Sequence, residues 1–567
     1  MLIISLCAAA VLAGCEKENT VKELPMTEDG TAYIAVRISS EPGTKGTDMN
    51  FEYGSEDEHK VTSADFYFYD AQGTFVSQAK VWNGGNANNQ NPDENIEYFG
   101  KNVVMLKGLT EKTFPKYVVT ILNQPEGFTP GVNLKDMEDK LIGAIKSGEN
   151  FIMTTTSYVH GGTGDYVGSQ PIYFANEVVE DNFVKDPDGD VTAKPVVIYV
   201  ERLAAKVKLD VDEALVPVGN DTYELKVSVA GDPNNTSAPA IGSETVRIRF
   251  DGWGLNATAK QTHIVKNIKT DWNLGSFEWN EDSNFRSLWG MGTAYDKDYD
   301  ANGTYGTYLN YNKWTDLSAH IGDNLYCAEN TNTDTKLDGH LGDGATSVVL
   351  AATVLVKDGE NWVDGDLVRY AGLLYNAKDF KAYVLNNLNT LGQLNYYKKT
   401  KTDETHFSYV QVGTDDIEVV LATAGDNKKV TLALTAEAEG ATWVSAFDEE
   451  NGTDTPADIT GLKNALKGFT GTGYKGGKMF YNIPIEHLFE DGTEAIVEGE
   501  YGIVRNHYYK LTITSLNKLG NGVWNPGTGE SELPIIPDNP DDPDEYYQVG
   551  VQINILSWRV VSQNVEL

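Results

Sequence analysis

The sequence predicts an all-β protein with a few short helices, built as two antiparallel β-sandwich domains in tandem. Short runs in which apolar and polar residues alternate recur along the chain, with turn residues between them, which is typical of antiparallel sheets. Few segments show helical spacing. With 567 residues, the chain is longer than one hydrophobic core usually serves, so two domains are expected.

The chain is strongly acidic, with 83 acidic and 45 basic residues and a net charge of −38. A charge of this sign argues against nucleic acids and anionic membrane surfaces as partners. Cysteine is rare: Cys7 lies in a segment that we expect to be removed, and only Cys15 and Cys327 remain. The cysteines imply no disulfide framework, so stability must come from burial of the core.

Residues 1–15 are predicted to be a lipoprotein signal peptide. The apolar run 2–14 is too short to span a bilayer, and Leu12-Ala13-Gly14-Cys15 has the form of a lipobox, whose cysteine is lipidated. A plain signal peptide with a chance cysteine is the alternative. The basic residues that usually open such a peptide are missing, so we expect either an upstream start or an atypical signal.

Residues 16–45 are predicted to form a tether and a first strand, in which Ile34, Val36 and Ile38 alternate with other residues. The Pro/Gly-rich loop that follows, residues 41–47, should be exposed. A basic residue there is a candidate site for a trypsin-like protease. Lys45 is the first choice, and Arg37 is the alternative, although that cut would fall inside the strand. An ordinary lysine in an ordinary loop also fits the pattern.

The N-terminal β-sandwich domain is predicted to span residues 46–212. Residues 61–69 and 117–122 have the composition of strands, and residues 196–211 of one long strand or a strand pair. Apolar residues at helical spacing predict a helix over 134–147.

The C-terminal β-sandwich domain is predicted to span residues 213–530. It includes a loop-rich region, 284–345, that is dense in Asp, Asn, Gly, Tyr and Trp, and a predicted helix at 380–391. The predicted strands are 347–354, 417–421 and 508–514.

The final segment, 531–567, is predicted to be a proline-rich arm that carries a strand. Proline occurs at every third position from Pro534 to Pro543 among acidic residues, which indicates a stiff polyproline II arm. In the strand that follows, apolar residues alternate with small or polar ones; they are Val549, Val551, Ile553 and Ile555. A strand on such an arm is poorly placed to add to its own sheet and well placed to reach a neighbour.

The two ends of the chain match each other position by position. Residues 33–38 align with residues 548–553, so that Ile34 corresponds to Val549, Val36 to Val551 and Ile38 to Ile553. Two strands with the same faces could fill the same groove. The alternative is that strands resemble one another over six residues.

No pattern in the sequence predicts catalysis or a metal site. The eight histidines are scattered, and neither HExxH nor CxxC occurs, which argues against zinc. Residues 473–478 resemble a phosphate loop only loosely and are better explained as a glycine hairpin. Residues 298–303 open like a calcium loop, but Leu309 stands where the bidentate glutamate belongs. We therefore expect no enzyme, no cofactor and no metal.

Several segments resemble the type V pilins, the lipoprotein fimbrillins of Bacteroidia, and are most similar to the minor-fimbrium shaft subunits. The most specific is residues 501–509, which is followed by Gly520, Pro526 and the proline arm that ends in the strand with Trp558. Further similar segments are 325–331, 200–207 and 151–154. The resemblance covers nearly the whole chain.

The resemblance implies two transthyretin-like sandwiches and a mechanism of assembly by strand exchange. The subunit would be lipidated at Cys15, its only contact with a membrane, and exported to the outer membrane and the cell surface. A trypsin-like surface protease would remove the first strand and open a groove. The C-terminal strand of another copy, carrying Trp558 at its end, would fill that groove. In the known family the cut follows an arginine, whereas the loop here offers Lys45.

The implied function is that of a structural shaft subunit of a fimbrium, whose partners are copies of itself and accessory tip and anchor subunits. A second hypothesis is a fimbrial tip or cell-anchored lipoprotein adhesin that binds glycan or host protein, suggested by the Tyr/Trp-rich region 284–345. A surface hydrolase is a third hypothesis, for which no catalytic constellation is found.

Overall fold

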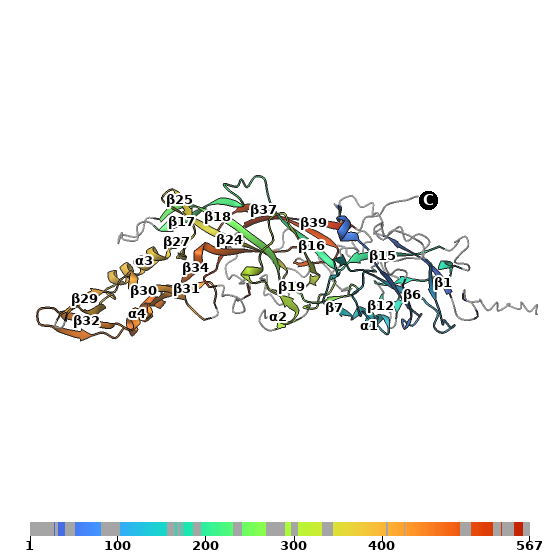
Figure 1. Cartoon of the computed structure of the whole chain (residues 1–567), viewed down its shortest axis with the longest axis horizontal. Helices are drawn as coiled ribbons and strands as arrows, with labels where there is room; N and C mark the ends of the chain where they lie inside the picture. The colour runs from blue at the N-terminus through green and yellow to red at the C-terminus, as the bar shows by residue number, and fades with distance from the viewer. Residues whose placement is uncertain are drawn as a thin grey trace, which may run out of the picture.

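The computed structural model of the chain consists mainly of β-strands, most of them in antiparallel pairs, with a few short helices. The prediction of an all-β fold with few short helices is thereby confirmed. The molecule is elongated, with β1 (Ala32–Ser39) near one end and β29 (Phe407–Gln411) at the other (Figure 1). The structure describes residues 26, 28, 32–39, 51–80, 103–155, 165–166, 170–171, 174–184, 194–230, 241–267, 290–295, 297, 304–331, 344–403, 406–424, 426–487, 501–525, 534–535 and 549–559.

A nine-stranded sheet forms the N-terminal part of the described structure, in the order β14-β1-β15-β10-β6-β3-β4, with β5 added to β1 and β13 to β6. Its β3 is buried on both faces, because Phe66 and Phe68 pack into one core cluster while Tyr67 and Tyr69 pack into another. The strands are β3 (Ala64–Tyr69), β4 (Phe75–Lys80), β5 (Val103–Leu106), β6 (Tyr117–Leu122), β10 (Met153–Thr155), β13 (Asn176–Glu177), β14 (Phe183–Val184) and β15 (Val196–Arg202).

A five-stranded sheet follows the N-terminal sheet along the chain, in the order β2-β39-β37-β16-β22. The sequence stretch 196–211 is divided at Leu203, so that β15 belongs to the first sheet and β16 to the second. This change of sheet comes before the domain boundary predicted near residue 212. The strands are β2 (Phe51–Tyr53), β16 (Ala204–Val211), β22 (Asn324–Ala328), β37 (His507–Leu516) and β39 (Val549–Arg559).

The largest described sheet has eleven strands in the order β30-β31-β34-β26-β27-β17-β18-β24-β35-β38, with β25 added to β24. Its apolar face packs against β16 and β37 of the five-stranded sheet, and residues of both sheets share one core cluster. The strands are β17 (Thr222–Ala230), β18 (Ile241–Asn256), β24 (Ser347–Asp358), β25 (Asn361–Val363), β26 (Leu367–Tyr370), β27 (Leu373–Asn376), β30 (Ile417–Leu421), β31 (Lys429–Leu434), β34 (Gly471–Tyr474), β35 (Lys478–Pro484) and β38 (Asn521–Gly522).

The end of the molecule opposite β1 carries a four-stranded sheet, in the order β29-β28-β32-β33, and the helix α3 (Ala377–Thr390) (Figure 1). The helix begins where the Asn376 side chain accepts a hydrogen bond from the backbone of Asp379, and its apolar face, with Phe380 and Leu388, is buried. The other strands here are β28 (Tyr397–Lys401), β32 (Thr442–Asp448) and β33 (Thr453–Pro456).

Short strand pairs and helices complete the described structure. The pairs are β7 (Leu141–Ile142) with β20 (Thr262–His263), β8 (Lys146–Ser147) with β9 (Asn150–Phe151), β11 (Asp165–Tyr166) with β12 (Gln170–Pro171), β19 (Thr258–Ala259) with β21 (Leu309–Asn310), and β23 (Asn330–Thr331) with β36 (Gly502–Ile503). The helices are α1 (Leu134–Glu138), α2 (Thr304–Tyr308), α4 (Ala436–Glu439) and α5 (Thr460–Lys467), and the 3-10 turns are η1 (Glu56–His59), η3 (Glu180–Asn182), η5 (Trp314–Asp316), η7 (Thr414–Asp416) and η8 (Lys475–Gly477).

The prediction of a helix over residues 134–147 is wrong after Glu138, where α1 ends. Leu134 and Met137 are buried on α1 as the spacing predicts, but the helix ends at Glu138. Leu141 and Ile142 instead form β7 and pair with β20, so the later apolar positions of the pattern serve a strand. The helical spacing of Leu134, Met137, Leu141 and Ile145 did not distinguish between these outcomes.

Candidate functional site

The predicted removable strand lies inside the N-terminal sheet as β1. The side chains of Ala32, Ile34 and Val36 are buried, the latter two with 0% and 3% exposure. They pack in one core cluster with Phe66, Val118 and Ile198, among others. Burial of each such side chain contributes about 1.5–3 kcal/mol. β1 is therefore part of the core.

β1 has strand partners on both of its sides. Its second half runs parallel to β15, with Val36 opposite Val196 and Ile38 opposite Ile198. Its first half pairs antiparallel with β5 and with β14. We call the position of β1 between these strands the β1 slot. Without β1, the slot would present unpaired backbone on two sides and an apolar floor.

The C-terminal strand, β39, pairs with its own chain. It runs antiparallel to β37 from His507 opposite Ser557 to Leu516 opposite Val549, with a bulge near Ser515. The expectation that this strand is poorly placed to add to its own sheet is therefore wrong. β37 lies between β16 and β39 in the sheet. Without β39, the edge of β37 that faces away from β16 would have unpaired backbone groups, and β39 pairs with this edge.

The two terminal strands thus lie in different sheets of one chain, β1 in the nine-stranded sheet and β39 in the five-stranded sheet. Val551 and Ile553 lie opposite Ile513 and Leu511 of β37, and Ile555 lies opposite Tyr509. Near its end, Trp558 lies opposite Glu52 of β2. The structure does not bring the two strands into one groove, so replacement of one by the other remains a proposal.

The base of the proline arm is fastened to the body of the protein. Ile535 is buried, its backbone N–H donates to the carbonyl of Asn312 (2.7 Å), and its carbonyl accepts from the side chain of Asn256 (2.9 Å). Residues 536–548 lie outside the described residues. The arm therefore has a fixed origin.

Other sequence-predicted features also lie outside the described residues. These are the lipobox with Cys15, the loop with Lys45, and residues 298–303. Arg37 lies within β1, opposite Val197 of β15, so its backbone is part of the parallel ladder. A protease would have to unfold the strand to reach that bond, which favours the loop as the cleavage site.

Three segments that the sequence analysis singled out, 200–207, 325–331 and 501–509, meet at a buried junction. Glu58 of η1 lies at its centre and pairs with Lys206 of β16, with 2.8 Å between Oε1 and Nζ. The hydroxyl of Tyr326 donates to the same carboxylate (2.6 Å). Both members of the ion pair are nearly buried, at 5% and 8% side-chain exposure, so neither charge has much access to water.

The pKa of Glu58 reflects this environment. Burial alone would raise it, but hydrogen bonds from Lys206, Tyr326 and the backbone N–H of Ser55 together hold the pKa below its ordinary value of 4.5. The carboxylate is therefore ionised at neutral pH. Conversely, burial and the bond to Glu58 raise the pKa of Tyr326, so its hydroxyl stays a donor.

Two further buried ion pairs complete the junction. Nζ of Lys266 lies 3.2 Å from Oε2 of Glu201 on β15. The fully buried Arg505 lies beside Glu329 and donates from Nη2 to the hydroxyl of Thr262 (3.1 Å) and the carbonyl of His263 (2.8 Å). Burial, with the nearby Arg505 charge, lowers the pKa of His263, so its ring is neutral at neutral pH. These contacts tie the N-terminal sheet to strands far along the chain.

Sequence reasoning missed Glu58 as a member of this junction. A single glutamate among 83 acidic residues carries no signal of its own. The spacing Ser55-x-x-Glu58, in which the Glu58 side chain accepts from the Ser55 backbone, is a capping pattern that could have marked the residue. Its partners, Lys206 and Tyr326, are too distant in sequence to be inferred.

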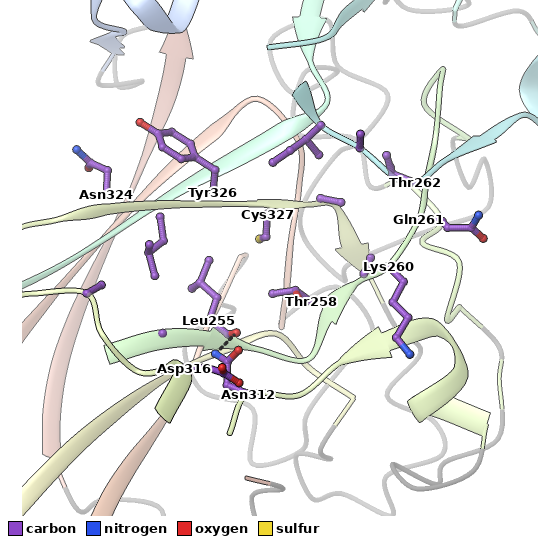
Figure 2. A pocket seen from close by; sticks show the side chains of 18 of the residues that line it. Leu255, Thr258, Lys260, Gln261, Thr262, Asn312, Asp316, Asn324, Tyr326 and Cys327 are labelled. Atoms are coloured by element: carbon purple, nitrogen blue, oxygen red, sulfur yellow. Dashed lines mark hydrogen bonds between the residues drawn. The ribbon is translucent and has the colours of Figure 1, made fainter. Parts of the chain in front are cut away.

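A cavity of about 720 Å³ lies beside the junction. It is lined by Ile142 and Ile145 from the N-terminal part and by residues of β18, β19 and β22, including Leu255 and Tyr326. Figure 2 shows Asn312 and Asp316 at one wall, where the Asn312 side chain donates to the Leu255 carbonyl (2.7 Å), with Lys260 and Gln261 further along. The lining mixes apolar groups such as Leu255 with polar and charged groups such as Lys260 and Asp316, as in sites for small ligands.

The buried thiol of Cys327 also borders this cavity. Burial raises its pKa to about 12, so it is protonated at neutral pH and unsuited to nucleophilic or redox chemistry. Within the described ranges, no group of three or more His, Cys, Asp or Glu side chains is placed to hold a metal ion. No described helix is long and apolar enough to cross a membrane.

A comparison with known protein families gives a match in the C-terminal part of the chain. Residues 472–564 match the family described as "Major fimbrial subunit protein type IV, Fimbrillin, C-terminal". None of the curated proteins matches the chain.

The chain is also similar to solved structures at low identity. A fimbrilin (fimA) from Porphyromonas gingivalis W83 has 12% identity and a TM-score of 0.33, over 94% of this chain and 99% of that one. The tip fimbrial protein Mfa3 from Porphyromonas gingivalis has 10% identity and a TM-score of 0.29, over 93% and 100%. A fimbrial assembly protein from Parabacteroides distasonis ATCC 8503 has 10% identity and a TM-score of 0.24, over 59% and 84%.

The family match covers the part of the chain that contains β35, β37 and β39, and so includes the C-terminal strand. The family is one of major fimbrial subunits. The C-terminal region of the chain, residues 472–564, is therefore similar to the C-terminal part of fimbrillins.

Proposed function

We propose that the chain is a polymerising shaft subunit of a cell-surface fimbria, exported as a lipoprotein through Cys15. In this proposal a trypsin-like protease cuts after Lys45, β1 leaves its slot, and β39 of another copy enters. The observation that carries the proposal is the position of β1, a short N-terminal strand whose Ile34 and Val36 are buried in the core. Its loss would leave an apolar groove that the matching C-terminal strand fits.

The pairing of β39 with β37 makes assembly an exchange, because the strand must leave its own sheet before it enters another. In the β1 slot, Tyr33 and Ile34 pair with β14 on one edge and with β5 on the other, and the second half of the strand pairs with β15. In its own chain, β39 pairs along its length with β37 but gains only the three residues of β2 on its other edge. By register, the slot pairs β1 at ten positions, four with β15, four with β5 and two with β14. The sheet of its own chain pairs β39 at twelve positions, nine with β37 and three with β2, so the exchange replaces one ladder with another of similar size.

Assembly of this kind would be head-to-tail and open. Main-chain pairing would supply affinity, and the pockets filled by alternate side chains would supply specificity. Because donor and slot are different surfaces, each added copy presents a new strand, and the product is a filament. Its other partners would be accessory tip and anchor subunits, and its location the fimbrium on the outer membrane.

Removal of the C-terminal strand tests this function. A chain lacking residues 546–567 should remain a folded monomer by circular dichroism and form no filaments by electron microscopy. The matched control lacks only residues 560–567, beyond β39, and should form filaments. Filaments from the chain that lacks residues 546–567 would contradict strand donation.

A second candidate function, a tip or cell-anchored adhesin that binds glycan, is favoured by the cavity in Figure 2. Residues 312–328, from the Tyr-rich region, line a large part of it. A volume near 720 Å³ suits a small saccharide. A glycan array that shows binding by the intact protein, lost in Asn312→Leu with retained fold, would support this alternative. An array that shows no binding would count against the adhesin and favour the shaft subunit.

A further inference from the structure

The short strand β2 covers the end of the C-terminal strand. It pairs parallel with β39, with Phe51 opposite Ser557 and Tyr53 opposite Arg559. In the described part of the chain, β2 is the strand that pairs with the edge of β39 opposite β37. β2 directly follows, in sequence, the loop that contains Lys45.

The segment that carries β2 is anchored beside the same sheet. Three residues after the strand ends, η1 begins, and Glu58 within it binds Lys206 of β16 and Tyr326 of β22. The carbonyl of Glu58 accepts from Nε of Arg202 at 2.8 Å. The Lys206 ammonium in turn lies over the ring of Tyr508 on β37, 4.5 Å from its centre. The anchor thus fastens β2 to three strands of the sheet that holds β39.

We infer that residues 51–59 form a clasp that keeps the C-terminal strand on its own chain until the N-terminal segment has been cut. This inference rests on the proposed strand exchange and adds its regulation. The clasp consists of the buried contacts of Glu58 and the three paired residues of β2. It holds β39 without making its release prohibitive.

A single cut at Lys45 would affect both the β1 slot and the donor strand β39. In the uncut chain, the connection from β1 to β2 is held at both ends, by the core at Val36 and by the anchor at Glu58. After a cut at Lys45, β2 lies a few residues from a new chain terminus and is held at one end only. Terminal segments with few contacts open most readily. The cut that vacates the slot therefore also loosens the donor strand.

Hydrogen exchange of residues 549–559 tests the clasp on monomeric protein. We expect their amides to exchange roughly tenfold faster in uncut Glu58→Gln than in the uncut wild type, because the anchor has lost its ion pair. The monomer fraction of Lys45-cut protein should show the same direction of change. The control Glu177→Gln, which alters an exposed ion pair with Lys116 in the first sheet, should leave the exchange unchanged.

A second variant separates loss of the clasp from loss of the fold. The triple change Phe51→Gly, Glu52→Ser and Tyr53→Gly weakens β2 while it leaves Glu58 in place, and it should also raise exchange at 549–559. Equal exchange in wild type, both variants and cut protein would overturn the clasp. Hydrogen exchange is measured on monomers, so its result does not depend on the deletion experiment. If the cut wild type formed no filaments, that result would count against strand exchange and not against the clasp.

Discussion

Nε of Arg505 lies 3.3 Å from Oε1 of Glu329, and the two side chains are 0% and 2% exposed. Arg505 lies in the turn that leads into β37, and Glu329 follows β22, so the pair joins segments far apart in the sequence. A buried pair adds little net stability compared with apolar residues, but the loss of one partner leaves an uncompensated charge. The junction therefore depends on both partners.

Glu329→Gln should destabilise the protein by about 3–5 kcal/mol, because the buried Arg505 loses its counter-charge. Denaturant unfolding followed by fluorescence measures the change. The matched control is Glu177→Gln, whose ion pair with Lys116 is 40% exposed and should contribute less than about 1 kcal/mol. Equal effects of the two variants would show that the junction pair is not structurally important.

Ile34→Ala should destabilise the uncut chain by about 2–5 kcal/mol, because it opens a cavity in the first core cluster. In assembled filaments the same change should have no effect, since the proposal removes β1 before assembly. Thermal melting of the uncut monomer and of filaments compares the two states. Leu141→Ala, at a side chain that is 42% exposed, is the control for a substitution outside the core. Filaments weakened by Ile34→Ala would indicate that β1 is retained.

Lys45→Gln should block processing and leave a monomer, whereas Arg37→Gln should be processed normally. The reason is that the Arg37 backbone is paired with β15, while Lys45 lies in the predicted Pro/Gly-rich loop. N-terminal sequencing of protein from the cell surface should give Gly46 as the first residue. A start at Ile38 would instead indicate cleavage within β1.

Stability should fall in acid through Glu58. Its pKa in the folded chain is lower than the ordinary value of 4.5, so its ion pair contributes fully above pH 4.5 and is lost as the pH falls through the lowered pKa. The stability difference between wild type and Glu58→Gln should therefore be constant from pH 5 to 7 and shrink below about pH 4. Urea unfolding at a series of pH values measures it. A constant difference down to pH 2 would argue against this titration.

Much of the fold could be predicted from the sequence where the local pattern of apolar residues matches the element that the folded chain forms. Residues 117–122 and 417–421 form the predicted strands β6 and β30 with the predicted bounds, because apolar runs of this length fit the middle or the edge of a buried sheet. The predicted helix at 380–391 corresponds to α3, which has a capping residue and a clear apolar face.

The features that the sequence did not predict depend on contacts between residues far apart in the chain. The apolar residues after Met137 fit a helix as well as a strand, and pairing with Thr262 and His263 decided for the strand. The return of β39 to β37 depends on a free edge that only the assembled sheet provides. Glu58, Lys206 and Tyr326 carry no shared sequence signal, so their junction could not be foreseen.

Cysteine cross-linking in assembled filaments tests the exchange most directly, because the two locations of β39 give different neighbours to one residue. In its own chain, Gln552 lies opposite Thr512. Aligned with β1 in the slot of another copy, Gln552 takes the position of Arg37, which lies opposite Val197. Gln552→Cys with Val197→Cys should give a disulfide-linked ladder of subunits, and Gln552→Cys with Thr512→Cys should give none. Filaments that show only the Thr512 cross-link, within single chains, would contradict the account.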